Sequence, residues 1–223
     1  MNTFDYVPFR DLLVGNIINA ERSEAVALIE SVAQKVGLPA AISNVLDPAL
    51  IEIGELWSKE KLSLAQGYVA AKITEDVLLK AVDSMEWCTN TEHLHIPVVL
   101  ANIEDDFHSL GRKMVGTFLQ LSGWDVHDMG NDVTAAEMVD KAVELHAPII
   151  GVSAMLYTSS LNITKVREEI ERRQLSGKIK LAVGGAIFKV RPKLVGEVGA
   201  DGTAVSAMEA PQLFAGLVKS LSL

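Results

Sequence analysis

The sequence predicts an α/β protein with an N-terminal four-helix bundle and a C-terminal, doubly wound, five-stranded parallel sheet. Two observations carry this prediction. Up to about residue 85 of the 223, apolar side chains recur at helical spacing. From residue 96 onward, short apolar runs suited to buried strands alternate with amphipathic helices. That alternation is typical of a parallel sheet with helices on both faces.

The N-terminal part is expected to hold four helices joined by short connections, as in an up-and-down bundle. Ser23 precedes the second helix, and Gly37 stands where that helix should end. The third helix runs through Pro48, which belongs to a first turn or a kink. The helices are expected near residues 11–18, 23–36, 48–57 and 63–85.

Residues 86–95, EWCTNTEHLH, are polar and lack periodicity, so they are predicted to be a linker. The predicted domains are accordingly 1–88 and 89–223.

The second domain is expected to be Rossmann-like, in the flavodoxin-like arrangement. In such a sheet a ligand binds at the carboxyl ends of the strands, where the strand order switches direction. Strands are expected at 96–101, 124–127, 148–152, 179–183 and 202–205, and helices at 109–122, 135–146, 162–174, 187–197 and 210–221.

Composition excludes several classes of function. The formal net charge is -9 and the pI is near 5.0, so direct binding to nucleic acid is not expected. The single cysteine, Cys88, rules out an intrachain disulfide and a multi-cysteine metal site. The N-terminus does not resemble a signal peptide, and no apolar run reaches the roughly 20 residues that span a membrane. We therefore expect a soluble, cytoplasmic protein with no membrane partner.

Three predicted strand ends carry the residues that could do chemistry. The first opens into Asp106-Phe107-His108-Ser109-Leu110-Gly111. With a carboxylate two residues from an imidazole, one ring nitrogen can bond to Asp106 while the other faces a ligand or metal. The third strand ends at Ser153-Ala154-Met155 and the fourth at Gly184-Gly185.

Together these segments resemble the cobalamin-binding signature of the methionine-synthase-like corrinoid proteins: Asp-x-His-x-x-Gly, then Ser-x-Leu, then Gly-Gly. The intervals between them fit as well. Met155 departs from the usual Leu but keeps its volume and apolar character. The helical half also resembles this family, whose helical cap carries Gly-(Asp/Glu)-Leu-aromatic and a later Leu. Here these are Gly54-Glu55-Leu56-Trp57 and Leu64.

The resemblance implies a role for each matching residue. His108 would bind cobalt in place of the cofactor's own base, with Asp106 behind it and Ser159 closing the relay. Ser153, Gly184, Gly185 and Ala207 would surround the buried nucleotide tail, while Trp57 and Leu64 would shield the upper face of the corrin. The other expected cofactor contacts are Phe107, Ser109, Gly111, Met155 and Tyr157.

Two functions are compatible with this resemblance. The favoured one is a corrinoid carrier that binds methylcobalamin and completes no turnover alone. It would pass a methyl group between donor and acceptor methyltransferases and depend on a reductive activase. The alternative is an adenosylcobalamin-dependent light or cobalamin sensor. Such sensors share the tryptophan at Trp57 but have Glu-His where this chain has Gly67-Tyr68. A receiver domain, suggested by Asp105-Asp106, is excluded because Ser153 and Val205 replace its phosphoacceptor Asp and its Lys.

Overall fold

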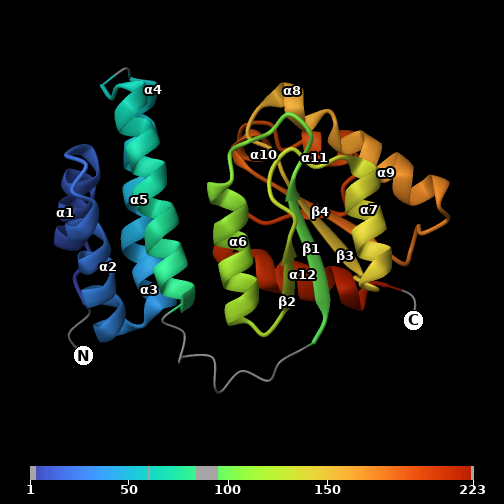
Figure 1. Cartoon of the computed structure of the whole chain (residues 1–223), viewed down its shortest axis with the longest axis horizontal. Coiled ribbons are helices and arrows are strands. Elements are labelled where there is room, and N and C mark those ends of the chain that lie inside the picture. The colour runs from blue at the N-terminus through green and yellow to red at the C-terminus, as the bar shows by residue number, and fades with distance from the viewer. Residues whose placement is uncertain (1–3, 60, 84–94, 222–223) are drawn as a thin grey trace. The chain divides into compact units, whose positions relative to one another are not determined.

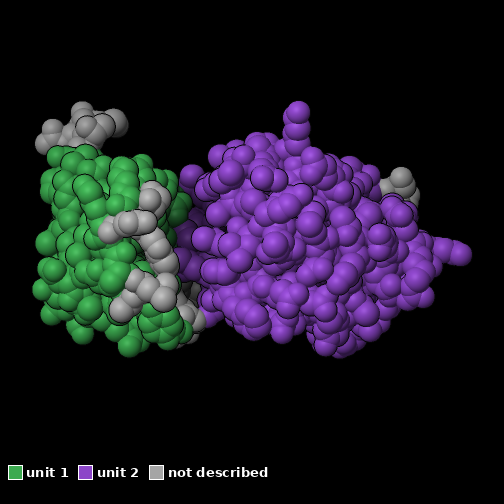
Figure 2. All heavy atoms as spheres, turned by 90° about the horizontal axis from the view of Figure 1, so that it is seen from above, with its two compact units in different colours: residues 1–87 green, residues 88–223 purple. Residues whose placement is uncertain are grey.

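The structure is a computed structural model that describes residues 4–59, 61–83 and 95–221. The chain divides into two compact units, Met1–Trp87 and Cys88–Leu223 (Figure 2). The predicted linker at 86–95 lies outside the described residues, apart from His95. In the part of the chain that is described, no helix combines the length and the apolar character that crossing a membrane requires.

The first unit is helical throughout its described part, as predicted. Its core is formed by apolar side chains from every helical segment, and α1 packs against α2, α4 and α5. The segments are α1 (Val7–Ile18), α2 (Arg22–Val36), α3 (Leu38–Ala41), the π-helical turn η1 (Ile42–Leu46), α4 (Asp47–Ser58) and α5 (Leu64–Asp83).

The third predicted helix is longer than the sequence pattern indicated. The segments α3, η1 and α4 follow one another without a break, so this rod begins at Leu38. Pro48 is the second residue of α4, directly after the π-helical turn. Proline has no N–H to continue α-helical bonding, and a wider turn before it is consistent with that loss. Gly37 ends α2 with a φ of 85°, which favours glycine at this position.

The second unit contains a five-stranded, fully parallel sheet in the order β2-β1-β3-β4-β5. The chain moves outward from β1 to β2 and then returns to the other side of β1, so the order switches between β1 and β3. The strands are β1 (Pro97–Asn102), β2 (Asp125–Asp128), β3 (Ile149–Ser153), β4 (Lys180–Gly184) and β5 (Gly202–Thr203).

Helices cover both faces of this sheet (Figure 1). One buried cluster joins the strands to α7 (Ala135–Glu144) and α9 (Ile163–Arg172). The other joins them to α6 (Leu110–Leu121) and α12 (Ala210–Lys219), where Trp124 packs edge-on against Phe214. The predicted doubly wound architecture is therefore confirmed.

Three elements differ from the prediction. The single helix expected at 187–197 is two short helices, α10 (Ala186–Val190) and α11 (Leu194–Glu197), because Pro192 interrupts the helical bonding between them. The expected last strand is only two residues long, and η3 (Ala207–Glu209) follows it. A short helix, α8 (Tyr157–Ser160), precedes α9 and was not expected.

Candidate cofactor-binding site

The carboxyl ends of three neighbouring strands form one row. Asn102 at the end of β1 is paired in register with Ser153 at the end of β3, and Ser153 is paired with Gly184 at the end of β4. The structure therefore brings the three predicted segments to the same edge of the sheet, beside the switch in strand order.

The loop after β1 turns Asp106 inward. Asp105 has a φ of 66°, and its N–H donates to Oδ1 of Asp132 at 2.9 Å. The N–H of Asp106 donates to the carbonyl of Ile103 at 2.9 Å, while its own carbonyl accepts from the N–H of Asp132 at 3.2 Å. This tight turn, fixed to the loop after β2, places the Asp106 side chain beneath His108.

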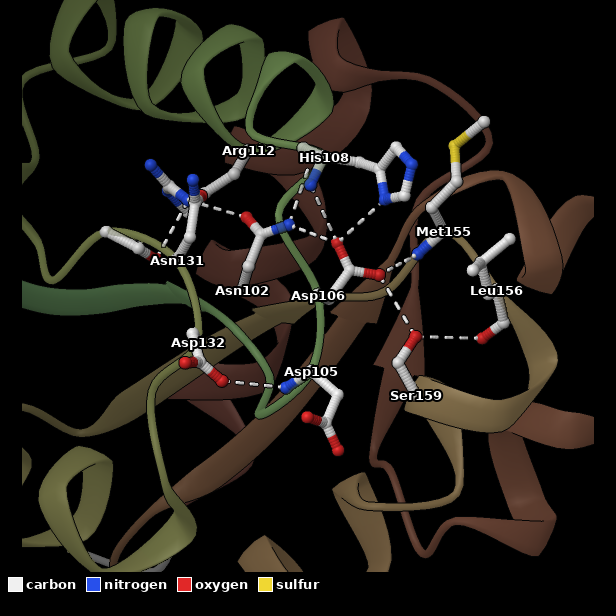
Figure 3. A network of polar contacts seen from close by, with 11 residues as sticks. Asn102, Asp105, Asp106, His108, Arg112, Asn131, Asp132, Met155, Leu156 and Ser159 are labelled. Atoms are coloured by element: carbon white, nitrogen blue, oxygen red, sulfur yellow. Dashed lines mark hydrogen bonds and ion pairs between the residues drawn. The ribbon is translucent and has the colours of Figure 1, made fainter.

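The carboxylate of Asp106 is buried and accepts hydrogen bonds on both oxygens (Figure 3). Oδ1 accepts from Nδ2 of Asn102 at 2.7 Å and from the backbone N–H of His108 at 3.0 Å. Oδ2 accepts from the N–H of Met155 at 2.7 Å and from the hydroxyl of Ser159 at 3.0 Å. A carboxylate with donors on both oxygens has a fixed plane and remains ionised.

The pKa of Asp106 reflects two opposing effects. Burial alone would raise it, because burial penalises the charged form. The hydrogen bonds from Met155, His108, Asn102 and Ser159 oppose burial and together lower the pKa below its ordinary value. The ionised carboxylate can therefore accept a hydrogen bond from Nδ1–H of the His108 imidazole above it.

The imidazole of His108 lies between this carboxylate and solvent. Its side chain is 50% exposed, and its Nδ1 lies 3.4 Å from Oδ1 of Asp106. The other ring nitrogen points away from the carboxylate (Figure 3). The contact through Nδ1 favours a proton there, which leaves a lone pair on Nε2 for a ligand.

Ser159 reaches Asp106 from the short helix α8. Its side chain is buried, and its hydroxyl lies 3.1 Å from the carbonyl of Leu156 as well as 3.0 Å from Oδ2 of Asp106. A hydroxyl has one proton, so these two acceptors share a single donor. The sequence motif implied this serine, but the helix that carries it was not predicted.

Gly184, the last residue of β4, and Gly185, which follows it, differ in their surroundings. A β-carbon at Gly184 would meet no heavy atom within 4 Å among the described residues, and the same holds at Gly111. At Gly185, φ is +112° and a β-carbon would lie 2.0 Å from the carbonyl oxygen of Ala154. Gly185 is thus required by the fold itself, whereas Gly184 borders open space.

Sequence reasoning missed Asn102 and Arg112, which extend the network behind Asp106. Nη1 of Arg112 donates to Oδ1 of Asn102 at 2.6 Å. A signal was present in both cases. Asn102 is a polar residue ending an apolar strand, and Arg112 shares a helical stripe with Gly116 and Leu119, all buried.

Comparison with known protein families identifies both units. Residues 96–212 match one family model described as a B12 binding domain, and residues 10–80 match a second model with the same description. The chain belongs to the B12-binding family. In this B12-binding chain the two matches together cover most of the described residues.

Its relatives include corrinoid proteins of Methanosarcina species. The B12-binding chain is 32% identical to dimethylamine corrinoid protein 1 of Methanosarcina mazei over 195 residues, which are 87% of this chain and 88% of that one. It is 33% identical to trimethylamine corrinoid protein 2 of Methanosarcina acetivorans over 123 residues, 55% of this chain and 56% of that one. The fold matches the monomethylamine corrinoid protein of Methanosarcina barkeri with a TM-score of 0.80 at 24% identity, covering 94% and 98% of the two chains.

The surface around His108 fits a large, flat cofactor such as B12. Apolar side chains that would normally be buried are exposed here: Phe107 is 66% exposed and Met155 is 44% exposed. Tyr157 is also exposed and lies under the guanidinium of Arg191, 4.4 Å from the ring centroid. Ser153 is half-buried, and its hydroxyl makes no hydrogen bond among the described residues. Apolar edges, an available imidazole and an unused hydroxyl suit a corrinoid with a polar tail.

Two of the remaining predicted residues lie at helix starts, and the other two have side chains outside the described part of the structure. Ser109 precedes α6, and Ala207 is the first residue of η3. Trp57 falls within α4 and Leu64 begins α5, but the side chains of both lie outside what the structure describes.

Proposed function

We propose that this chain is a corrinoid methyl carrier that binds cobalamin base-off, with His108 as the lower ligand of cobalt. The observation that carries the proposal is the half-exposed imidazole of His108 above the buried, fully hydrogen-bonded carboxylate of Asp106. Relatives named as dimethylamine and trimethylamine corrinoid proteins support the same function.

The cofactor would supply a cobalt centre that accepts a methyl group from one partner and releases it to another. The chain's own residues would control the lower face of that centre. His108 presents Nε2, Asp106 holds the proton on Nδ1, and Ser159 donates to the second oxygen of Asp106. Because Nδ1 of the imidazole contacts Asp106, and Asp106 is hydrogen-bonded to Ser159, movement of one proton along this relay would strengthen or weaken the ligand.

The carboxyl edge of the sheet would hold the rest of the cofactor. Ser153 would donate to the nucleotide tail, and the open space at Gly184 would let the tail pass close to the backbone. Ala207 would line the same slot. The corrin would rest on exposed and half-buried residues of the first and third strand ends: Phe107, Ser109, Gly111, Met155 and Tyr157.

The helical unit would cover the upper face of the cofactor. We assign Trp57 and Leu64 to the shielding of a methyl group from water, as the motif in α4 and α5 implies. Methylcobalamin is therefore the form that we expect in the working protein.

Such a carrier needs a donor methyltransferase, an acceptor methyltransferase and a reductive activase. One solved structure with the same fold is a chain from a methanol:cobalamin methyltransferase complex of Methanosarcina barkeri, at a TM-score of 0.52 and 18% identity. The relatives named for methylamines make a methylated amine the first methyl donor to test.

The experiment is a comparison of upper ligands. The affinity of the purified full chain for methylcobalamin and for adenosylcobalamin is measured by titration in the dark. The mass of each complex in solution is then measured on a sizing column before and after illumination. If the chain is a carrier, it should bind methylcobalamin at least as tightly as adenosylcobalamin, and the mass of each complex in solution should not change in light. A strong preference for adenosylcobalamin, with a light-driven change of oligomeric state, would instead establish the sensor.

A further inference from the structure

The guanidinium of Arg112 is a buried junction between three segments. Its Nη1 lies 2.6 Å from Oδ1 of Asn102, 2.8 Å from the carbonyl of Gly130 and 2.6 Å from Oδ1 of Asn131. Its Nε lies 2.7 Å from Oδ1 of Asp128 but is not aligned for a hydrogen bond. The side chain is only 4% exposed. One charge from α6 thus joins the end of β1 to the loop after β2 (Figure 3).

This junction determines which way the Asn102 amide faces. Arginine can only donate hydrogen bonds, so the amide oxygen of Asn102 must face it. The amide nitrogen then faces the other way, where it donates to Oδ1 of Asp106 at 2.7 Å and to the carbonyl of His108 at 3.1 Å. The reversed amide would set an oxygen against two acceptors and a nitrogen against the guanidinium. Arg112 therefore selects a single orientation.

We propose that Arg112 and Asn102 are positioning residues for His108, with Arg112 acting through the Asn102 amide and Asn102 acting through the Asp106 carboxylate. The inference rests on the proposed ligand role of His108 and extends its support beyond Asp106 and Ser159. The amide donor fixes the plane of the carboxylate, and that plane keeps the imidazole proton on Nδ1. The same amide also donates to the backbone carbonyl of His108. One group therefore holds both the backbone of His108 and the carboxylate that its imidazole contacts.

The link from Asn102 to the ligand can be tested without any cofactor. Nitrogen NMR of labelled histidine in the apoprotein reports which ring nitrogen of His108 carries the proton. In the native chain we expect the proton on Nδ1. Asn102→Leu keeps the branched shape of the side chain but removes both the donor to Asp106 and the acceptor for Arg112. In this variant the preference for Nδ1 should fall by roughly tenfold or more, the size expected when the Asp106 carboxylate loses a hydrogen bond.

Asn131→Ala is the matched control. The exposed side chain of Asn131 accepts from the same Nη1 of Arg112 but makes no hydrogen bond to Asn102 or Asp106 among the described residues. It should leave the His108 proton on Nδ1. If Asn131→Ala and Asn102→Leu shift the proton equally, the effect is a general loosening of the loops, and the proposal is overturned.

A second comparison tests whether Arg112 acts through Asn102. Arg112→Met should shift the proton in the native background but add little in the Asn102→Leu background, since the effects of coupled residues are not additive. Arg112→Lys keeps a donor and a charge, so it should retain more of the native preference. Because loss of a buried cation can unfold the chain, thermal unfolding is measured alongside, and Asn102→Leu tests the network with the arginine intact.

The outcome separates this inference from the proposed function. Spin resonance of the cob(II)alamin complex shows whether a histidine nitrogen binds cobalt in the native chain. If it does, and both Asn102→Leu and Arg112→Met leave the His108 proton and the coordination unchanged, only the positioning role is wrong. If the native chain shows no histidine coordination, the proposed ligand itself fails.

Discussion

Nδ1 of His108 and Oδ1 of Asp106 meet at 3.4 Å, with the imidazole 50% exposed and the carboxylate side chain fully buried. Four donors hold the carboxylate in place beneath the imidazole. A contact of this length is long for a hydrogen bond, and such contacts commonly shorten when the ligand is bound.

The Ser159 hydroxyl should matter to Asp106 in a way that its neighbour does not. Ser159→Ala removes a donor to Oδ2 of Asp106, whereas Ser160→Ala removes a buried donor to the carbonyl of Tyr157. Each should cost about 1–2 kcal/mol in the free energy of unfolding. Only Ser159→Ala should raise the pKa of Asp106 and weaken histidine coordination in the loaded protein. Carboxyl NMR and an absorbance titration measure these effects, and equal effects of the two variants would contradict the relay.

Replacement of Gly184 and replacement of Gly185 should have different effects on stability and cobalamin binding. Gly184→Leu enters open space, so its unfolding free energy should stay within about 0.5 kcal/mol of native while cobalamin binding weakens. Gly185→Ala should destabilise the apoprotein by roughly 1–3 kcal/mol, because of the φ of +112° and the carbonyl of Ala154. Unfolding and cobalamin titration are measured for both variants. Native affinity in Gly184→Leu would show that the tail passes elsewhere.

Acid should remove the stabilisation that Asp106 supplies. Its pKa in the folded chain is lowered from 3.8, so its ionised form stabilises the fold fully above that value. As the pH falls from 3.8 through the lower folded pKa, this contribution is lost. Asp106→Asn should therefore cost about 1.5–3 kcal/mol near neutral pH and progressively less in acid.

Denaturant unfolding across a pH series measures that difference. Asp105→Asn provides the control, since this exposed neighbour carries the same charge and its side chain lies outside the Asp106 hydrogen bonds. A gap between native and Asp106→Asn that stays constant down to the lowest pH would contradict the lowered pKa.

Much of the second unit could be predicted from sequence, because its strands are apolar runs and its motif residues follow strand ends. The motif residues Asp106, Ser153 and Gly184 follow or end such strands, and the register confirms that the carboxyl ends of β1, β3 and β4 share one edge. The helix break at Pro192 could also have been read from the sequence. What could not be predicted is which groups Arg112 contacts, because two of them lie on the distant loop at Gly130 and Asn131.

Gly185 illustrates a different limit. The motif implied room for a cofactor tail at both glycines, and nothing in the sequence distinguishes them. Their backbone conformations distinguish them because, of the two, only Gly185 has a positive φ and a backbone carbonyl close to where a β-carbon would lie. The reason for this glycine lies in the packing of β4 against the end of β3, which appears only once the strands are paired.

The central claim is that His108 binds cobalt. The most direct measurement is spin resonance of the cob(II)alamin complex, made with ordinary histidine and with histidine carrying the heavy nitrogen isotope. We predict coupling to one nitrogen that changes its pattern on labelling. It should persist in the control His127→Ala and disappear in His108→Ala. Coupling that is unchanged by histidine labelling would mean that the cofactor's own base remains on cobalt, and it would contradict the account.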